Sequence, residues 1–253
     1  MHLDVMADQV FLDIALDSAS VLANGYSGIG TLGEKTLHRT LKYYFEPDES
    51  KHEIEFLGHV ADIMNEDGIV EIQTASFDRL IPKLEHFLAT TKVRVVYPII
   101  VNRYICRIDT ETGESNPPRK SSKKGRSCDA LCGLSVIRRF IPHPNLSILV
   151  VLVDATETRM LGGTKKVGRK RTEKIDCIPT KINSIIFLDN PKDYFSLLPD
   201  NLPKEFSAKD FEKCAKIRGI SSHGALMLLL KLGVLTRDKK GGRSYIYSIN
   251  QTY

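Results

Sequence analysis

Apolar and polar positions in the stretch His52–Thr74 predict a β-hairpin. Residues with high strand propensity stand on both sides of Asn65–Gly68 (NEDG), a sequence typical of a tight turn. A two-residue loop at Glu66 and Asp67 sets four opposed pairs, Asn65–Gly68, Met64–Ile69, Ile63–Val70 and Asp62–Glu71. Gln73 lies two residues after Glu71 and therefore shares its face. The pattern thus predicts three polar groups, two of them carboxylates, on one patch of an otherwise apolar hairpin.

The hydrophobic spacing on either side of the hairpin predicts helices and a buried strand. The expected helices are residues 8–23, Glu34–Phe45 with a core stripe of Leu37, Leu41, Tyr44 and Phe45, and Phe77–Ala89 with an irregular first turn at Pro82. The nearly continuous apolar run Lys92–Val101 predicts a buried strand. This order of elements predicts an α/β fold with a mixed sheet flanked by helices.

The second half of the chain alternates polar segments with short apolar ones. We expect a polar excursion at Arg107–Ser127, a helix at Leu131–Ile141, a strand at Leu146–Asp154 and a basic loop at Lys165–Lys174. A capping box at Ser207 and Asp210 opens a helix to about Arg218, and a second helix runs from Ser221 or Ser222 through Leu232. Strands at Val234–Arg237 and Ser244–Ile249 follow. The expected domains are 1–33, 34–204 and 205–253.

Length and composition are those of an ordinary globular protein. The chain has 253 residues, 42% hydrophobic and 26% charged. No apolar stretch approaches the roughly 20 residues that span a membrane. Because Asp4, Asp8, Asp13 and Asp17 interrupt its apolar stretch, we expect no signal peptide at the N-terminus. The expected location is the cytoplasm, with no membrane partner.

Charge is distributed unevenly along the chain. Residues 1–100 have a net charge of −8, residues 101–200 of +7 and residues 201–253 of +6. Five basic residues lie in Arg119–Arg126, and six with one acid lie in Lys165–Lys174. Such loops are either solvated turns or clamps for a phosphate backbone, and we expect the clamp. The candidate DNA-binding residues of these loops are Arg119, Lys120, Lys123, Lys124, Arg126, Lys165, Lys166, Arg169, Lys170 and Arg171.

The opposed carboxylates of the hairpin suggest a cation site. Asp62 and Glu71 repel each other, and a divalent cation resolves the repulsion. The alternative is a solvated hairpin whose acids point outward, but the apolar neighbours indicate that it is buried. Glu34, aligned with the core stripe of its helix, either complements the helix dipole or points into the site. The scattered cysteines suit a reducing compartment, and a zinc site from Cys128, Cys132, His143 and Cys177 is an open alternative.

Together these elements resemble the core of the PD-(D/E)XK nuclease superfamily over roughly residues 34–101. That core runs helix with an acid, strand with Asp, strand with (D/E)xK, helix, strand, and Glu34, Asp62 and Glu71-Ile72-Gln73 follow this order. Ala61 replaces the usual proline, which is a common variation. Gln73 stands where the lysine is expected. Some restriction enzymes of the superfamily carry Gln or Glu there, and others recruit a lysine from the next helix, where Lys83 is the candidate.

The resemblance implies metal-assisted hydrolysis of a phosphodiester. Asp62 and Glu71 would bind Mg²⁺ or Mn²⁺, with the carbonyl of Ile72 as a further ligand. Gln73 would orient the attacking water, and Glu34 would assist through the water shell of the metal. We expect His38, His52 and His59 to be surface or packing residues rather than metal ligands.

Residues Phe206–Ile249 separately resemble winged-helix DNA-binding domains. The resemblance makes Ser221, Ser222 and His223 candidate contacts at the start of a recognition helix, and Lys239, Lys240 and Arg243 candidate contacts on a wing. The expected protein is a restriction-endonuclease-like endonuclease that binds DNA, with a homodimer left open. The alternatives are an inactive nuclease-fold regulator or recombination accessory, and a structural protein whose leucine-rich second helix binds a protein partner.

Overall fold

A computed structural model describes residues 8–23, 35–109, 112–164, 170–239 and 244–250. The side chains at 8, 21–23, 162–171 and 239 are also outside the description. Several predicted site residues therefore lie outside it, namely Glu34, Lys165, Lys166, Arg169, Lys240 and Arg243, together with the side chains of Lys170, Arg171 and Lys239. No helix in the described ranges is both long and apolar enough to cross a membrane.

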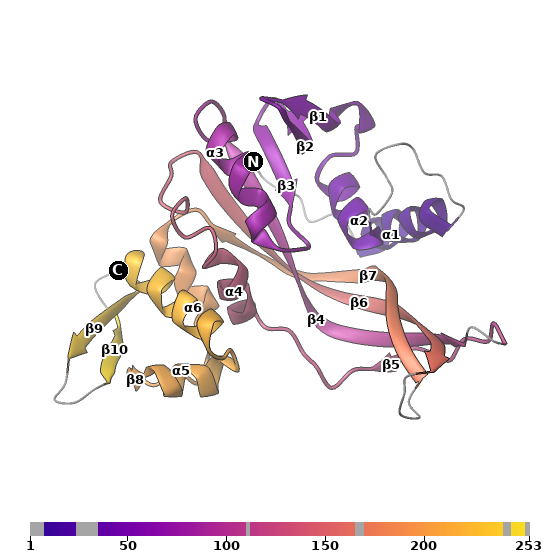
Figure 1. Ribbon diagram of the computed structural model, residues 1–253. Coiled ribbons are helices and arrows are strands. Elements are labelled where there is room, and N and C mark those ends of the chain that lie inside the picture. Colours follow the sequence, from indigo (N-terminus) through magenta and orange to yellow (C-terminus); the bar gives the residue numbers. More distant parts are fainter. Residues whose placement is uncertain (1–7, 24–34, 110–111, 165–169, 240–243, 251–253) are drawn as a thin grey trace. The chain divides into compact units, whose positions relative to one another are not determined.

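The fold is mixed α/β, with a large mixed sheet and flanking helices (Figure 1). The helices are α1 (Asp8–Ala23), α2 (Thr36–Phe45), α3 (Ile81–Phe87), α4 (Ala130–Leu134), α5 (Ala208–Ala215) and α6 (Ile220–Lys231). The strands of the large sheet are β1 (His52–Phe56), β2 (His59–Asn65), β3 (Gly68–Ile72), β4 (Val93–Asp109), β5 (Arg119–Lys120), β6 (Leu146–Thr164) and β7 (Lys170–Leu188). Their order is β1-β2-β3-β4-β6-β7, and β5 pairs with β4.

The chain divides into two compact units. Unit 1 comprises residues 1–52, 100–125 and 152–184, and unit 2 comprises 53–99, 126–151 and 185–253. Strands β4, β6 and β7 each contribute residues to both units. The three-part division at residues 34 and 205 stays a prediction.

Three of the four predicted hairpin pairs are confirmed in unit 2, and the strand pairing does not extend to the fourth, Asp62–Glu71. Ile63 pairs with Val70, Met64 with Ile69 and Asn65 with Gly68. Gly68 has a φ of +124°, and an added Cβ would lie 2.4 Å from the carbonyl oxygen of Lys92. This turn therefore requires glycine. The same carbonyl accepts the amide hydrogen of Ile69, so the turn also fixes where β3 meets β4.

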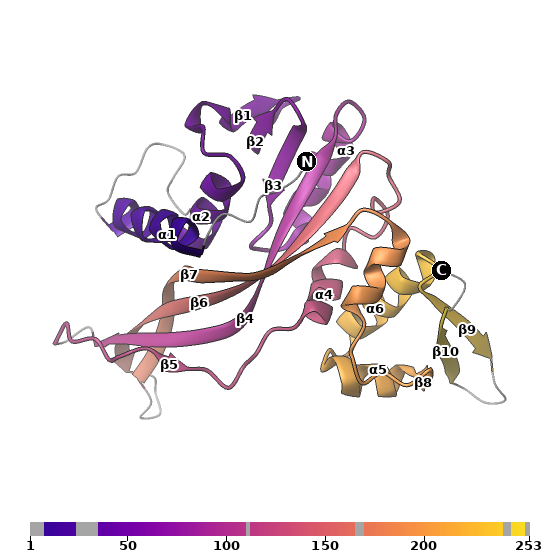
Figure 2. The same ribbon diagram turned by 180° about the vertical axis from the view of Figure 1, so that it is seen from behind.

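A βαβ crossover follows the hairpin. β3 pairs with β4 in parallel, with Glu71 beside Val95. The connection contains a 3₁₀ turn, Phe77–Leu80, and then α3, which has Pro82 in its first turn. The irregular start predicted at Pro82 is thus confirmed. α3 runs along β3 and β4 in both views (Figures 1 and 2).

In unit 1, α1 and α2 pack together, and Phe11 meets the ring of Tyr44 edge-on. The predicted α2 stripe is buried, as expected. Lys35 at the N-cap of α2 makes no side-chain cap. Asp176 of β7 supplies one instead, because its carboxylate accepts the Thr36 amide at 3.2 Å and the Thr36 hydroxyl at 2.5 Å.

We expect Asp176→Ala to lower the free energy of unfolding by about 1–2 kcal/mol, the usual cost of losing a helix cap. Urea unfolding followed by circular dichroism measures the change. Asp67→Asn, in the exposed hairpin turn, is the control and should change stability by less than about 0.5 kcal/mol. Equal stability of Asp176→Ala and wild type would contradict this role for the carboxylate.

The C-terminal part of unit 2 is a small α+β layer (Figure 2). β8 (Glu205–Ser207), β9 (Leu235–Lys239) and β10 (Tyr245–Ile249) form an antiparallel sheet in the order β8-β10-β9. The predicted capping box is confirmed, because Ser207 accepts the Asp210 amide and Asp210 accepts the Ser207 amide. α6 packs against α4 and α5, which explains why its leucines are buried.

The structure corrects four predicted elements. One is the strand expected at Leu146–Asp154, because β6 continues to Thr164, ten residues beyond the predicted end. Three others need a physical explanation. β4 continues to Asp109, eight residues beyond the predicted end, because its second half is no longer buried on both faces and lacks the apolar run used to predict it. The helix expected at Leu131–Ile141 ends at Leu134. Tight turns follow before Pro142, and in one of them the Phe140 amide donates to the Ile137 carbonyl.

The third correction concerns the basic loop Lys165–Lys174. Residues from Lys170 onward belong to β7, a 19-residue strand for which the sequence pattern gave no expectation. Its first residues are dense in charge, as in a loop, and Pro179 is unusual within a strand. Pairing along the equally long β6 provides the backbone hydrogen bonds that override this local composition.

Candidate functional site

The hairpin site is built from β2, β3 and α3, all within unit 2. Glu71 lies on β3 and is only 3% exposed. The ammonium of Lys83 from α3 lies 2.8 Å from Glu71 Oε2 and 3.1 Å from Oε1. Asp62 from β2 accepts the amide hydrogen of Ile72 at 2.7 Å. The sheet register and the crossover helix therefore bring Asp62, Glu71 and Lys83 together, as the sequence predicted.

Electrostatics at Glu71 favour a bound proton near neutral pH. Burial raises the pKa of Glu71, and the charge of Asp62 raises it further. The charge and hydrogen bonds of Lys83 lower it. The net result is a pKa of about 7, against an ordinary value of 4.5. A buried carboxyl whose pKa is perturbed by burial and a named charge partner is typical of functional sites.

Gln73 lies at the end of this patch and is 9% exposed. Its backbone amide donates to Val96 O at 2.8 Å, which continues the pairing of β3 with β4. Its side-chain Nε2 donates to the carbonyl of Ser76 at 2.8 Å. Ser76 was not expected to be a partner of Gln73. The only signal for this contact was a polar residue, Gln73, just before a short turn.

The donor set of the hairpin suits a hard divalent cation in part. Asp62 and Glu71 supply carboxylate oxygens, and Mg²⁺ is typically held by one or two carboxylates plus water and phosphate. Burial, and after it the charge of Asp62, raises the pKa of Glu71. Within the described ranges, no three His, Cys, Asp or Glu side chains cluster as a metal site, and this includes the zinc alternative at Cys128, Cys132, His143 and Cys177.

The described histidines near the hairpin have partners in the protein. His52 Nε2 lies 2.7 Å from the carbonyl oxygen of Glu46, and its ring packs on Tyr43. His59 Nε2 lies 2.7 Å from Nδ1 of His86. These contacts agree with the predicted surface and packing roles.

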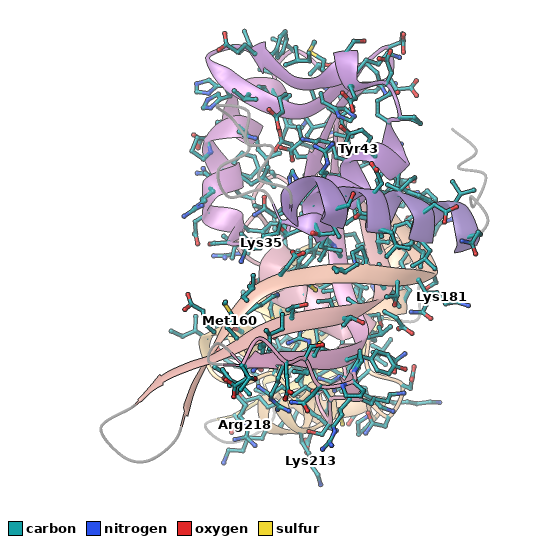
Figure 3. All side chains as sticks on the ribbon, turned by 90° about the vertical axis from the view of Figure 1, so that its right-hand side faces the viewer. Lys35, Tyr43, Met160, Lys181, Lys213 and Arg218 are labelled. Atoms are coloured by element: carbon teal, nitrogen blue, oxygen red, sulfur yellow. The ribbon has the colours of Figure 1, made fainter. Side chains whose placement is uncertain are left out.

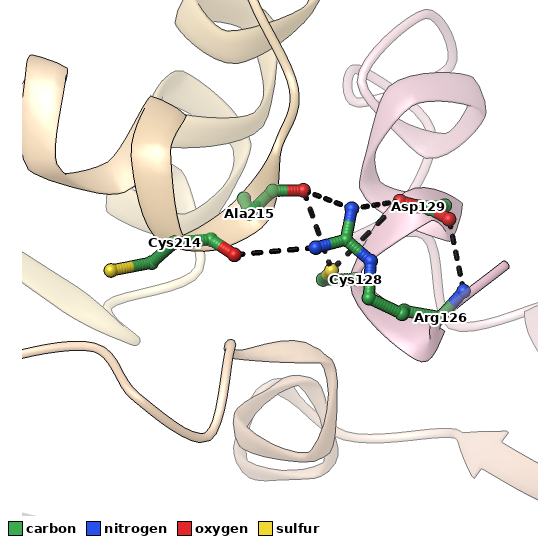
Figure 4. Close-up of polar contacts among 5 residues, drawn as sticks. All are labelled: Arg126, Cys128, Asp129, Cys214 and Ala215. Carbon is green, nitrogen blue, oxygen red and sulfur yellow. Dashed lines mark hydrogen bonds and ion pairs between the residues drawn. The ribbon is translucent and has the colours of Figure 1, made fainter. Parts of the chain in front are cut away.

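The predicted basic residues fall into distinct environments. Arg119, Lys120, Lys123 and Lys124 are exposed in unit 1, and Lys120 lies over the ring of Tyr104. Arg126, in unit 2, is bound to its own protein instead (Figure 4). Its guanidinium donates to the carbonyls of Cys214 and Ala215 at the end of α5 and to Asp129. Arg126 therefore holds the C-terminus of α5 in place.

At the start of α6 the predicted contacts differ in exposure. Ser221 and His223 are exposed, whereas Ser222 is 1% exposed and faces the core. Gly224 lies against Ser135, where an added Cβ would be 2.7 Å from the hydroxyl. The helix thus turns one side toward residues near α4 and leaves Ser221 and His223 on the surface.

Fold and site define a mixed α/β protein with a buried Glu–Lys pair beside a second carboxylate. The chain belongs to the family of the domain of unknown function DUF8091, whose model matches residues 35–189. It is also similar to a protein of Treponema pallidum (strain Nichols) described as "Uncharacterized protein", with 31% identity over 223 residues that cover 87% of this chain and 86% of the relative. No solved structure matches the chain. Asp62, Glu71 and Lys83 lie inside the family match, and residues 205–253 lie outside it.

Proposed function

We propose that the chain is a metal-dependent DNA endonuclease with Asp62, Glu71 and Lys83 at its active site. The observation that carries the proposal is the contact of Lys83 with both oxygens of the buried Glu71, at 2.8 and 3.1 Å. The order of elements supports it, because α2, β2, β3, α3 and β4 follow one another as in the PD-(D/E)XK core, with β1 as an additional strand between α2 and β2. Lys83 then occupies the role of the lysine that Gln73 replaces.

Each group has a defined task in this proposal. Mg²⁺ or Mn²⁺ held by Asp62, Glu71 and the Ile72 carbonyl would lower the pKa of a bound water and neutralise charge on the phosphate. Lys83 orients the Glu71 carboxylate and adds a positive charge where the transition state becomes more negative. Gln73, fixed by Ser76 O, orients water by hydrogen bonding and carries no charge.

The C-terminal layer is proposed to dock DNA as a winged helix. Two helices followed by a strand pair, with β8 completing the small sheet, support this. Ser221 and His223 on α6 and the β9–β10 segment are the proposed contact points, and the exposed residues of Arg119–Lys124 are proposed to bind phosphates. A homodimer and a cytoplasmic location stay predictions.

A cleavage assay tests the nuclease proposal. Wild type should nick or linearise supercoiled DNA with Mg²⁺ or Mn²⁺ and not with EDTA. Asp62→Asn should lose activity by on the order of 100-fold, because one carboxylate alone holds the cation poorly. Asparagine keeps an oxygen acceptor for the Ile72 amide, so folding should survive, and unfolding curves check this.

Asp67→Asn, on the exposed turn of the same hairpin, should cleave like wild type. Failure of the wild type to cleave supercoiled, linear or single-stranded DNA with either cation would reject the proposal.

A second function is favoured by one feature of the site. A neutral glutamine stands where the superfamily has its lysine, and the side-chain amide of Gln73 is already bonded to Ser76 O. Such a site fits a nuclease-fold protein that binds DNA without cleaving it. DNA binding by a folded wild type with no cleavage under any metal condition would select this alternative.

A further inference from the structure

Unit 1 contains a second buried carboxylate, which is surrounded by cations. Glu157 on β6 is 1% exposed. Arg159 Nε and Nη2 each lie 2.6 Å from Glu157 Oε1. Arg103 Nη1 lies 3.3 Å from Oε2, and Lys174 Nζ lies 3.6 Å from the same oxygen. We call Arg103, Glu157, Arg159 and Lys174 the Glu157 cluster. It draws on the three neighbouring strands β4, β6 and β7.

The Glu157 cluster has more positive charge than its carboxylate requires. Burial alone raises the pKa of Glu157, but the hydrogen bond from Arg159 and the charges of Lys174, Arg103 and Arg159 outweigh it, and the pKa is below its ordinary value. Glu157 is therefore ionised at neutral pH. Three cations around one carboxylate leave an excess of two positive charges.

The cationic groups remain accessible. The side chains of Arg103, Arg159 and Lys174 are 29%, 31% and 38% exposed. Among the described residues, Arg103 Nε and Glu157 Oε2 are buried atoms without a hydrogen-bond partner. Arg159 alone satisfies Oε1 with a two-pronged contact, so Arg103 and Lys174 are held at longer distances with donors to spare.

The surrounding sheet extends this basic surface. Arg119 of β5 pairs with Ile105 of β4, and Ile105 is two residues from Arg103, so the alternation of a strand puts Arg119 and Arg103 on one face. The amide of Ser121 donates to the carbonyl of Arg103 at 2.7 Å. The exposed basic segment after β5 is therefore anchored beside the Glu157 cluster.

We propose that Arg103, Arg159 and Lys174 bind phosphate groups of a DNA backbone, with Glu157 positioning the three cations. The proposal rests on the proposed function in its choice of DNA as ligand. Arginine donors in a fixed plane and a lysine point charge suit phosphate oxygens. The donor nitrogens of all three lie within 3.6 Å of the Glu157 carboxylate, so the three cations form one compact site of positive charge.

Binding titrations without cleavage test the proposal. A fluorescein-labelled duplex of about 20 base pairs is titrated in EDTA by fluorescence anisotropy, between about 50 and 200 mM salt. Arg103→Gln and Lys174→Gln should each reduce the salt slope of binding by about 0.9, and the double variant by about 1.8.

The matched control is Lys181→Gln. Lys181 lies seven residues beyond Lys174 on β7, roughly 23 Å along the strand. In Figure 3, Lys181 lies away from Met160, the residue that follows Arg159 on β6. This control should keep the wild-type slope.

Two further variants separate phosphate binding from support of the fold. Glu157→Gln removes the negative charge and should bind DNA at least as tightly as wild type. Arg103→Gln combined with Glu157→Gln removes both members of one ion pair, which avoids an uncompensated buried charge, and should still show the reduced slope. Unchanged slopes in folded Arg103 and Lys174 variants, weaker binding by folded Glu157→Gln, or tighter binding of an RNA duplex than of DNA would overturn the proposal.

These outcomes are independent of the nuclease test. A wild type that binds DNA with a salt slope sensitive to Arg103 and Lys174 but does not cleave would reject the nuclease and keep the phosphate site. If the wild type cleaves DNA and the variants of the Glu157 cluster bind it normally, the phosphate site is rejected and the nuclease proposal is kept. Absence of DNA binding by wild type would overturn the phosphate site.

Discussion

Lys83→Met is expected to abolish DNA cleavage, and adding Gln73→Lys is expected to restore part of it. Lys83 is the cation that contacts both oxygens of Glu71. Removing a preorganised charge from an active site typically costs 100- to 1,000-fold in rate, equivalent to about 3–4 kcal/mol. Position 73 is two residues beyond Glu71 on the same face, so a lysine there returns the charge to the patch by the shorter route.

The double substitution distinguishes an active site from a structural ion pair. If Lys83 only stabilises the fold, Gln73→Lys has no reason to restore turnover in the Lys83→Met background. If Lys83 provides the charge for catalysis, the relocated lysine should recover activity by at least about tenfold over Lys83→Met, about 1.4 kcal/mol in the barrier. The measurement is the initial rate of plasmid cleavage with Mg²⁺ and with Mn²⁺.

Lys92→Met is the matched control for this experiment. Lys92 is an exposed lysine in unit 2, and its backbone carbonyl accepts the amide hydrogen of Ile69. Wild-type rates are expected for it. Cleavage by Lys83→Met at the wild-type rate would remove Lys83 from the active site, whatever the double variant does.

The local patterns explain why the hairpin could be predicted and the long strands could not. The NEDG turn sets the register that pairs Ile63 with Val70, and the structure has this pair, with both side chains buried. Burial makes register specific, because a one-residue slip would turn every side chain to the other face. Lys83 became a candidate only through the resemblance to the PD-(D/E)XK superfamily, and the crossover helix α3 is what brings it to Glu71.

The Glu157 cluster was missed because its members are spread over 72 residues of sequence, from Arg103 to Lys174, and meet only through strand pairing. Glu157 and Arg159 stand two residues apart, and both lie beyond Asp154, where the predicted strand ended. A Glu and an Arg two apart beyond an apolar run were the one local signal. Likewise, nothing near Thr36 indicates that Asp176 caps its helix. Such long-range polar contacts depend on the tertiary fold.

Glu71 should make the stability of the protein depend on pH between about 4.5 and 7. Its folded pKa is about 7 against an ordinary 4.5, so between these values the folded state binds more protons than the unfolded state. Stability from the protonated carboxyl is therefore present below about pH 4.5 and is lost as pH rises through 7. The size of the effect is on the order of 3 kcal/mol.

Other carboxylates have the opposite dependence, so the comparison with Glu71→Gln isolates this one. Glu157, for example, has a lowered pKa and contributes stability that is lost in acid. We expect the stability difference, wild type minus Glu71→Gln, to fall by about 2.5 kcal/mol between pH 5 and pH 8. Urea unfolding at several pH values measures it. A difference that is constant with pH would contradict a raised pKa at Glu71.

The same measurement reports on the cation without any assay of activity. Above pH 7 the ionised Glu71 and Asp62 repel each other, and a divalent cation that binds the folded state alone offsets this by mass action. At 100 times its dissociation constant, Mg²⁺ or Mn²⁺ should stabilise wild type by about 2.7 kcal/mol at pH 8. The gain should shrink at pH 5, where a proton competes for Glu71, and should vanish in Glu71→Gln. Equal stabilisation of wild type and Glu71→Gln would show that the cation binds elsewhere.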